Sequence, residues 1–469
     1  MNYGKQRWLL LLIAALLVIV FACGESDEND DQTPLTGDDD DANDDDDDDN
    51  NDDNNDDDDT NSDDDTPCDT SKRPIVFVHG FLEVGDAFAT QTMRFASNNY
   101  CPDRIFAFDY DTLFGPLGTS GRLDNFIDRV LDRTEAEQVD LLGHSLGGAV
   151  CYQYLAEPEQ ASKVAHYVSL ASFPNGPVPN GVPGMSVSSA ADTMAGSSEI
   201  PGGQNVALDD LDHLQVATSE DTFAAIYPFF NEGEVPVTTD ILPESDIVLS
   251  GRSLVFGTNN PAADFLIRVF GVDSQTGERF SETPVAEYTS DRQGFWGDFA
   301  ASPDTYYEFE IHDPNDAFPP IHYYFESFPR SNNKLYFRVF PEPDTLLGLV
   351  FRLLPYNDDY AIFAYLNLNQ AMYFGRDTLA VNGVDLSIPG IMDPEISTIA
   401  LFFFDANFNG VSDETVAGGL FAFFPFIRFF DMIVPADEPG VIQFETNGRP
   451  LTMRNWPSKT GGLAIAVFQ

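Results

Sequence analysis

The stretch that decides the fold is Val139-Asp140-Leu141-Leu142-Gly143-His144-Ser145-Leu146-Gly147-Gly148-Ala149-Val150. Its apolar start predicts a buried strand, and the residues from Gly148 onward predict a helix. Between them stands a G-x-S-x-G turn, which holds a serine exposed where a strand passes into a helix. Glycine allows the backbone to turn that sharply. We therefore predict that Ser145 is a nucleophile; the alternative is an ordinary glycine- and serine-rich loop.

The residues around this stretch alternate between short apolar runs and helical patterns. A helical spacing of apolar residues occurs at 123–131, and a less regular one at 86–97. Strands buried on both faces and separated by helices are typical of a parallel sheet covered by helices. We therefore expect an α/β domain over residues 71–238. Its strands are predicted at 74–78, 105–108, 139–142, 165–171, 185–190 and 205–208.

The second half of the chain has a different texture. After Thr239, β-rich segments alternate with turn signals such as Asn259-Asn260-Pro261, a pattern typical of sandwiches and barrels. The pattern predicts an all-β region, with a β-sandwich at 239–330 and a second β-rich domain at 331–469. The alternative is that both belong to one sheet system. Few helices are expected here.

The N-terminus has the pattern of an export signal. Two basic residues precede an apolar stretch that is short for a bilayer span and ends at Cys23. Residues 1–23 are therefore predicted to be a signal peptide. The run Val20-Phe21-Ala22-Cys23 resembles the lipobox of bacterial lipoproteins, which implies that Cys23 is lipidated and, with Gly24 following, that the protein is retained at the outer membrane. A plain signal peptide or an uncleaved anchor is the alternative.

Residues 24–70 are predicted to be a disordered acidic tether. Between Glu25 and Thr66 there are 24 acidic residues and no basic one, so this segment repels itself and has nothing apolar to bury. The whole chain has a formal net charge of −55, which argues against nucleic acid as a partner. We expect a monomeric, exported outer-membrane or cell-surface lipoprotein that contacts the membrane through its lipid anchor. The alternative is a secreted protein.

An exported protein can carry disulfides. Cys68 and Cys101 each precede a predicted strand, and if those strands are parallel neighbours the two cysteines lie close together. A disulfide between them is therefore predicted. Cys151 falls on the predicted helix after Ser145, where a buried thiol is expected.

A serine nucleophile needs a base and an acid that orients the base. Both are expected at the ends of later strands. Asp192 follows the predicted strand at 185–190, and His213 follows the one at 205–208, so they are the candidate acid and base. Asp209, Asp210 and Asp212 are competing acids, but they are expected to form a solvated loop or a helix entry.

The reaction also needs hydrogen-bond donors for the oxyanion. One is expected to be the N–H of Leu146, at the start of the helix. The other is expected to be the N–H of Phe81, in the His-Gly-Phe loop after the first strand. His79 is expected to brace that loop.

Several blocks resemble small bacterial lipases of the lipase class 2 family. They are Ile75-Val76-Phe77-Val78-His79-Gly80-Phe81, Gly143-His144-Ser145-Leu146-Gly147-Gly148, Ser188-Ser189-Ala190-Ala191-Asp192 and Asp212-His213-Leu214. The resemblance implies an α/β-hydrolase that cleaves carboxylic esters, with Ser145, Asp192 and His213 as triad, Phe81 and Leu146 as oxyanion hole, and no required cofactor. The long β-rich half is also similar to that of an archaeal lipase whose C-terminal β domain helps to bind lipid.

Two segments of the C-terminal half permit more than one interpretation. The phenylalanine-rich stretch 420–430 fits a pair of buried strands or an acyl-chain groove. In the other, oxygen ligands recur at the spacing of a calcium loop, though Val416 stands where the last acidic ligand would be, and a hairpin turn is the alternative. The candidate calcium ligands are Asp405, Asn407, Asn409 and Asp413.

Loops on the expected catalytic edge, at 114–118 and 173–177, could gate a pocket or be static. Two other functions remain open. The same triad could serve a polyester depolymerase whose β half docks an insoluble polymer. The chain could also be a surface binding protein on a hydrolase scaffold that no longer catalyses.

Overall fold

The computed structural model describes residues 68–113, 118–417, 426–436 and 440–469. The chain divides after Ser71, and the fold described below belongs to Lys72–Gln469. The signal peptide with Cys23, nearly all of the acidic tether, and most of the 114–118 loop and the 420–430 stretch lie outside the described residues. Within them, no helix is both long and apolar enough to span a bilayer.

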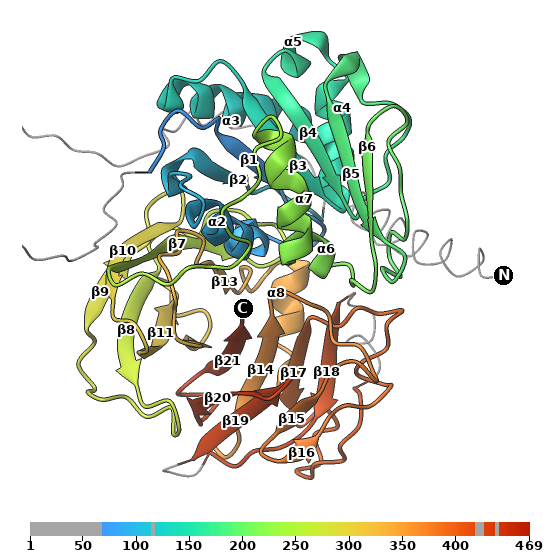
Figure 1. The fold of residues 1–469 in the computed structure, drawn as a ribbon. Helices are drawn as coiled ribbons and strands as arrows, with labels where there is room; N and C mark the ends of the chain where they lie inside the picture. The colour runs from blue at the N-terminus through green and yellow to red at the C-terminus, as the bar shows by residue number, and fades with distance from the viewer. Residues whose placement is uncertain (1–67, 114–117, 418–425, 437–439) are drawn as a thin grey trace, which may run out of the picture. The chain divides into compact units, whose positions relative to one another are not determined.

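The first part of the fold is a six-stranded parallel sheet (Figure 1). Its strand order is β2-β1-β3-β4-β5-β6, so the strand that precedes Ser145 is internal. The strands lie close to their predicted positions, although the third continues to His144. Their bounds are β1 (Ile75–Val78), β2 (Ile105–Phe108), β3 (Val139–His144), β4 (Val164–Leu170), β5 (Gly184–Ser189) and β6 (Gln204–Leu208).

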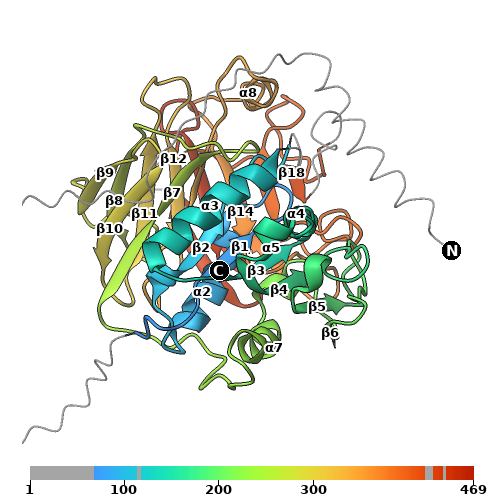
Figure 2. The ribbon, with the colours of Figure 1, turned by 90° about the horizontal axis from the view of Figure 1, so that it is seen from above.

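Helices cover both faces of this sheet, as Figure 2 shows from above. Alternate residues of β1 point to opposite faces, with Ile75 and Phe77 in one core and Val76 and Val78 in the other. The first core contains side chains of α2 (Ala89–Ala96) and α7 (Glu220–Phe230), and the second contains those of α3 (Thr119–Thr134) and α4 (Leu146–Leu155). The predicted α/β class is confirmed. Shorter elements are η1 (Gly85–Phe88), η2 (Pro102–Arg104), α5 (Pro158–Ala161), η3 (Pro179–Gly181) and α6 (Gln215–Thr218).

The second part of the fold is β-rich, as predicted. It contains a three-stranded sheet, β10-β7-β13, an eight-stranded sheet, β18-β17-β14-β21-β12-β11-β8-β9, and a four-stranded sheet, β16-β15-β19-β20. The strands are β7 (Ile247–Val255), β8 (Leu266–Val272), β9 (Ala286–Thr289), β10 (Phe295–Ala301), β11 (Tyr306–His312), β12 (Ile321–Phe325), β13 (Phe337–Val339), β14 (Ile362–Asn367), β15 (Leu379–Val381), β16 (Val384–Asp385), β17 (Ala400–Phe404), β18 (Ile427–Asp431), β19 (Val441–Thr446), β20 (Arg449–Arg454) and β21 (Leu463–Phe468).

The boundary expected between residues 330 and 331 does not separate two sheets. The C-terminal strand β21 pairs in parallel with β12 on one side and with β14 on the other. One eight-stranded sheet therefore contains strands from both predicted β domains, as the alternative of a shared sheet system expects. The reason is a long-range pairing, because β12 and β21 are far apart along the chain and nothing local in either strand specifies the other.

A short helix, α8 (Leu346–Phe351), interrupts the β-rich part, where few helices were expected. Thr345 is its N-cap, and the Thr345 hydroxyl accepts a hydrogen bond from the Gly348 N–H at 3.1 Å. At six residues the helix is too short to show a clear apolar period in the sequence, which explains why the pattern did not predict it.

The β-rich part buries one group of charges on its eight-stranded sheet. Glu308 and Glu310 of β11 and His322 of β12 lie together, and the Arg279 guanidinium forms ion pairs with both glutamates. Arg279 also stacks over the Phe270 ring, 3.5 Å from its centroid. Both carboxylates are thus paired with an arginine of the same chain, and His322 Nδ1 lies 2.7 Å from Glu308, which makes this cluster an ion-pair network.

Both cysteines of the predicted pair, Cys68 and Cys101, are disulfide-bonded. Among the described cysteines, Cys151 is free, and it is buried in α4. Burial raises the pKa of the Cys151 thiol well above its usual value, so this thiol is uncharged and packs as an apolar side chain.

Candidate active site

Ser145 occupies a sharp turn between β3 and α4. Its backbone has φ 51° and ψ −119°, which is unusual for a residue other than glycine. The Ser145 N–H donates to the Leu170 carbonyl at 2.9 Å, and the Ser172 hydroxyl donates to the Ser145 carbonyl at 2.7 Å. A Cβ at Gly147 would lie 2.1 Å from the Val78 carbonyl oxygen, so only glycine fits there. The turn therefore presents the half-buried Ser145 at the carboxyl edge of the sheet.

Asp192 and His213 lie at the same edge and touch each other. Asp192 follows β5 and His213 follows β6, and the Asp192 Oδ2 to His213 Nδ1 distance is 2.9 Å. The other oxygen, Oδ1, accepts the N–H groups of Met194 and Ala195. Burial alone would raise the Asp192 pKa, but His213 and these two N–H groups lower it. The carboxylate thus fixes Nδ1 as the protonated nitrogen and leaves Nε2 as the basic one.

The His213 turn and the Ser145 turn are joined through His144. The His144 Nε2–H donates to the His213 carbonyl at 3.0 Å, and the two imidazole rings are 4.8 Å apart between centroids. Because His144 directly precedes Ser145, this contact places the His213 backbone against the residue next to Ser145.

Glu83 completes this arrangement, and the sequence analysis missed it. Its Oε2 accepts the His144 Nδ1–H at 2.9 Å and the Gly80 N–H at 2.6 Å. Both His144 nitrogens thus face acceptors, so the ring is an imidazolium. Burial opposes both charges, yet the pair raises the pKa of His144 and lowers that of Glu83 to about 2. The sequence signal that could have pointed to Glu83 is its position three residues after Gly80 of the His-Gly pair.

The two expected oxyanion donors lie beside the serine turn. A Cβ at Gly80 would lie 3.0 Å from the Ser145 Cβ, so the His-Gly-Phe loop packs against Ser145. Among the described residues, no hydrogen-bond acceptor is found for the N–H of Phe81 or of Leu146. Two donors next to Ser145 are therefore free to receive a developing oxyanion.

His79 holds the backbone of this loop. Its Nδ1–H donates to the Gly80 carbonyl at 2.9 Å, and its Nε2 accepts the Tyr110 N–H at 3.4 Å. Complete burial lowers the His79 pKa, which keeps the ring neutral. This geometry suits the bracing role expected for His79.

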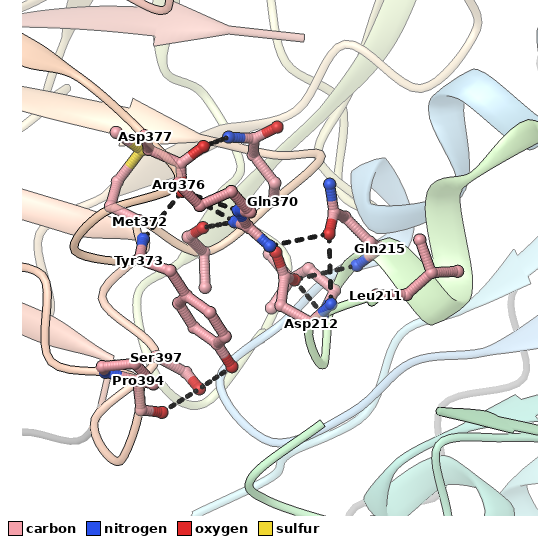
Figure 3. A network of polar contacts seen from close by, with 12 residues as sticks. Leu211, Asp212, Gln215, Gln370, Met372, Tyr373, Arg376, Asp377, Pro394 and Ser397 are labelled. Carbon is pink, nitrogen blue, oxygen red and sulfur yellow. Dashed lines mark hydrogen bonds and ion pairs between the residues drawn. The ribbon is translucent and has the colours of Figure 1, made fainter. Parts of the chain in front are cut away.

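The three competing acids divide between the two expected environments, because Asp209 and Asp210 are solvated and Asp212 lies at the entry to α6. Asp209 and Asp210 are exposed, but Asp212 is completely buried. Its carboxylate pairs with Arg376 of the β-rich part, with an Asp212 Oδ2 to Arg376 Nη2 distance of 2.8 Å (Figure 3). The sequence could not show this contact because the two residues are 164 positions apart.

Two further aspartates of the catalytic part also pair with arginines of the β-rich part. Asp86 accepts a two-pronged contact from Arg338 at 2.6 and 2.8 Å. Asp109 pairs with Arg252 at 2.7 Å. Asp86 lies in η1, just beyond the Gly80–Glu83 loop, and Asp109 directly follows β2. The β-rich part therefore supplies cations to three loops at the catalytic edge.

An apolar cavity with a volume of about 90 Å³ lies at the junction of the two parts. Its lining includes Leu82 and Glu83 from the His-Gly-Phe loop and Leu214, the residue after His213. The remaining walls are mainly apolar side chains of the eight-stranded sheet, such as Leu366 and Phe402. The cavity thus lies between the loops that neighbour Ser145 and His213 and the interior of the β-rich part, although neither Ser145 nor His213 lines it.

The candidate calcium loop closes on itself through hydrogen bonds. The side-chain amides of Asn407 and Asn409 donate to Asp413, and Asp405 accepts the N–H groups of Asn409 and Gly410. A hairpin turn and a calcium-binding loop would both bring these side chains together. The calcium site therefore stays a prediction. In the 173–177 loop, which the sequence analysis named as a possible gate, the Phe173 side chain is exposed, at 68%.

Sequence models of known domains match separate parts of the chain. The model of the alpha/beta hydrolase fold matches residues 73–202, and the lipase C-terminal domain model matches residues 245–341. A further C-terminal domain model matches residues 369–468. Residues 73–202 are therefore similar to the alpha/beta hydrolase fold and residues 245–341 to a lipase C-terminal domain, in agreement with the parallel sheet and the β-rich region described above.

The chain is also similar to solved structures over about a third of its length. The match to Aspergillus fumigatus lipase B has 12% identity and a TM-score of 0.30, and covers 36% of this chain and 54% of that one. A pyrethroid hydrolase matches at 16% identity and a TM-score of 0.28, covering 34% of this chain and 98% of that one. A predicted CIB-like hydrolase from Thermoplasma acidophilum matches at 16% identity and a TM-score of 0.28, covering 35% of this chain and 89% of that one. The chain thus spans about half the length of the Aspergillus lipase.

We predict that Glu83→Gln destabilises the protein most in mildly acidic solution. The lowered Glu83 pKa stabilises the fold above its unfolded value of 4.5, and this contribution is lost toward pH 2. The raised His144 pKa stabilises the fold below its unfolded value of 6.5, and this contribution is lost as the pH rises through the folded value. The loss of unfolding free energy should be about 2 kcal/mol near pH 5.5 and smaller at about pH 9.

Chemical denaturation of both proteins across this pH range measures the difference. Glu287→Gln is a matched control, because Glu287 forms an exposed pair with Arg268 and should change stability little. A Glu83→Gln penalty that grows steadily with pH would contradict the assignment of a charged His144.

Proposed function

We propose that this protein is a carboxylic-ester hydrolase of the lipase and esterase type, with Ser145 as nucleophile, His213 as base and Asp192 as the orienting acid. The observation that carries the proposal is the Asp192–His213 hydrogen bond of 2.9 Å beside the strained Ser145 turn. The two free N–H groups of Phe81 and Leu146 support it, because they add the donors that acyl transfer requires.

The proposed reaction has two steps. His213 Nε2 takes the Ser145 hydroxyl proton as Oγ attacks the ester carbonyl carbon, and the carbonyl oxygen becomes an anion bound by the two N–H groups. The intermediate collapses, the bond to the alcohol breaks, and His213 returns its proton to the leaving alcohol. Water, deprotonated by His213, then attacks the acyl-enzyme, and the proton passes back to Ser145 as the carboxylic acid leaves. Asp192 stabilises the imidazolium in both steps.

We further propose that the apolar cavity receives the acyl chain of the ester. Glu83 and Leu214, which line the cavity, are neighbours of the oxyanion loop and of the base, so a chain bound there can present its carbonyl to Ser145. Each methylene that leaves water contributes about 0.8 kcal/mol, which favours esters with long chains. The cavity lining includes Phe402 and Ile427. Ile427 belongs to the described part of the 420–430 stretch, which the sequence analysis named as a candidate acyl-chain groove.

The remaining proposal concerns location. The basic start, the apolar stretch and the lipobox-like end at Cys23 favour an exported lipoprotein, in which the acidic tether links the folded part to the membrane. Such a tether would let the folded part reach substrates near the outer membrane.

We predict that Ser145→Ala abolishes hydrolysis of p-nitrophenyl acyl esters, with a loss of about 10⁴-fold or more in kcat. Its thermal unfolding should stay close to that of wild type, because alanine removes only the hydroxyl. A fluorophosphonate probe should label the wild-type protein and leave the variant unlabelled. Wild-type protein that is folded yet neither labelled nor active would contradict the proposed function and favour the binding-protein alternative.

The acyl-chain proposal predicts that Ala400→Trp shortens the preferred ester. Ala400 lies on β17 and lines the cavity, so an indole there should occupy space needed by a long chain. We expect kcat/KM for the dodecanoate to fall about tenfold or more relative to the butyrate, as several methylenes lose their burial. Ala300→Trp is the control, because Ala300 is an exposed residue of β10. Equal losses on both esters would contradict the assignment of this cavity.

Lipidation predicts that Cys23→Ala releases the protein from membranes. Wild-type protein produced in a Gram-negative host should incorporate radiolabelled palmitate and sediment with the outer membrane. The Cys23→Ala variant should do neither if a lipid is the sole anchor. Palmitate-free wild-type protein that still sediments would favour the uncleaved-anchor alternative.

A further inference from the structure

The turn that carries His213 is shaped by the buried carboxylate before it. Asp212 Oδ1 accepts the N–H groups of Leu214 and Gln215 at 2.9 and 3.0 Å, where the chain enters α6. The Asp212 N–H in turn donates to the Gln215 side chain. These contacts fold the backbone around His213, so the direction of the imidazole depends on where the Asp212 carboxylate sits.

Arg376 of the β-rich part is the cation that balances this carboxylate. Figure 3 shows its guanidinium reaching Asp212 and Gln215 from the opposite side of the junction. Its Nη2 lies 2.8 Å from Asp212 Oδ2, and its Nη1 lies 2.9 Å from Gln215 Oε1. The Arg376 guanidinium thus contacts both Asp212 and Gln215, the residues at the two ends of the His213 turn.

Arg376 is itself held in place before it meets the turn. Its Nε donates to Asp377 at 2.9 Å, and its guanidinium lies over the Tyr373 ring, 4.6 Å from the centroid. Asp377 is fixed by the Tyr373 N–H and by the Gln370 side chain. Contacts within the β-rich part therefore hold the Arg376 guanidinium in position against the Asp212 carboxylate.

The same segment of the β-rich part also touches the loops beside the turn. The Thr193 hydroxyl, next to Asp192, donates to the Pro394 carbonyl at 2.5 Å. The Thr218 hydroxyl, at the end of α6, donates to the Asn369 carbonyl at 2.6 Å. Residues 369–394 thus contact the loop of the candidate acid and both ends of the segment that carries the candidate base.

We propose that Arg376 is a positioning residue for His213, acting through Asp212, so that the β-rich part completes the catalytic edge as well as lining the cavity. This inference rests on the proposed function. Without Arg376, Asp212 is a buried carboxylate without its cation, and it must move, take up water or bind a proton. Each of these shifts the turn, and a displacement of about 1 Å at a catalytic group can cost about 100-fold in rate.

The test compares three variants: Arg376→Met, Asp212→Asn and the double variant. Arg376→Met should lower kcat for p-nitrophenyl butyrate about 10- to 100-fold per serine titrated by fluorophosphonate, with KM nearly unchanged. Asp212→Asn should retain more activity than Arg376→Met, because the amide oxygen keeps both backbone hydrogen bonds and leaves no buried charge, while Arg376, which then faces the amide NH2, keeps its pairing with Asp377. The double variant should recover to within about threefold of Asp212→Asn, because no unpaired charge remains.

Arg330→Met is the matched control. Arg330 also comes from the β-rich part, and its partners in the described part of the chain are Glu244, Leu242, Ser97 and Ala96. Its loss should affect thermal stability without changing kcat per titrated serine. An equal fall in kcat for Arg330→Met and Arg376→Met, or a double variant no better than Arg376→Met, would overturn the positioning role.

A second readout does not depend on activity. The His213 Nδ1–H bonded to Asp192 should give a downfield proton NMR signal in wild type, in Asp212→Asn and in the double variant, and a shifted or broadened one in Arg376→Met. If wild-type protein is inactive but the signal follows this order, the proposed function fails and the positioning role stands. If wild type is active and Arg376→Met keeps both its kcat and the signal, the positioning role fails alone.

Discussion

A buried carboxylate must be matched by a cation or by several N–H donors, and this constraint joins the two parts of the molecule. Asp86 and Asp212 are buried and Asp109 has almost no exposed side chain, and each sits in a loop at the carboxyl edge of the parallel sheet. Their arginines all come from the β-rich part. Each of these carboxylates thus has its cation in the β-rich part, so the loops at this edge depend on the junction between the two parts.

The same junction explains why the cavity and the candidate catalytic residues belong together. Glu83 joins the His-Gly-Phe loop to His144, the His213 carbonyl accepts from His144, and Asp212 joins the His213 turn to the β-rich part. Leu82 and Leu214, from the two loops so fixed, form part of the cavity lining. Under the proposed function, these shared loops would couple binding of an acyl chain to the placement of His213.

Sequence patterns were informative where the chemistry is local. The G-x-S-x-G turn identified Ser145, and the ends of β5 and β6 pointed to Asp192 and His213, which lie within hydrogen-bond distance. Patterns failed where the deciding contact is remote. Asp212 was grouped with Asp209 and Asp210 in a solvated loop or helix entry, and its pairing with Arg376 could not be inferred from them. Glu83 had only its position after the His-Gly pair as a local sign, and its partner His144 is 61 residues away. Likewise the pairing of β21 with β12 could not be inferred from either strand.

The sequence by itself determined the α/β class, the position of the serine turn, and the β-rich character of the second half, because strand and helix periodicity and glycine-dependent turns are properties of a few consecutive residues. Only the tertiary structure decided which carboxylates are buried, which arginines balance them, and how one eight-stranded sheet unites the C-terminal half. The physical reason is that burial and charge pairing depend on which surfaces meet, and those surfaces are built from residues more than a hundred positions apart.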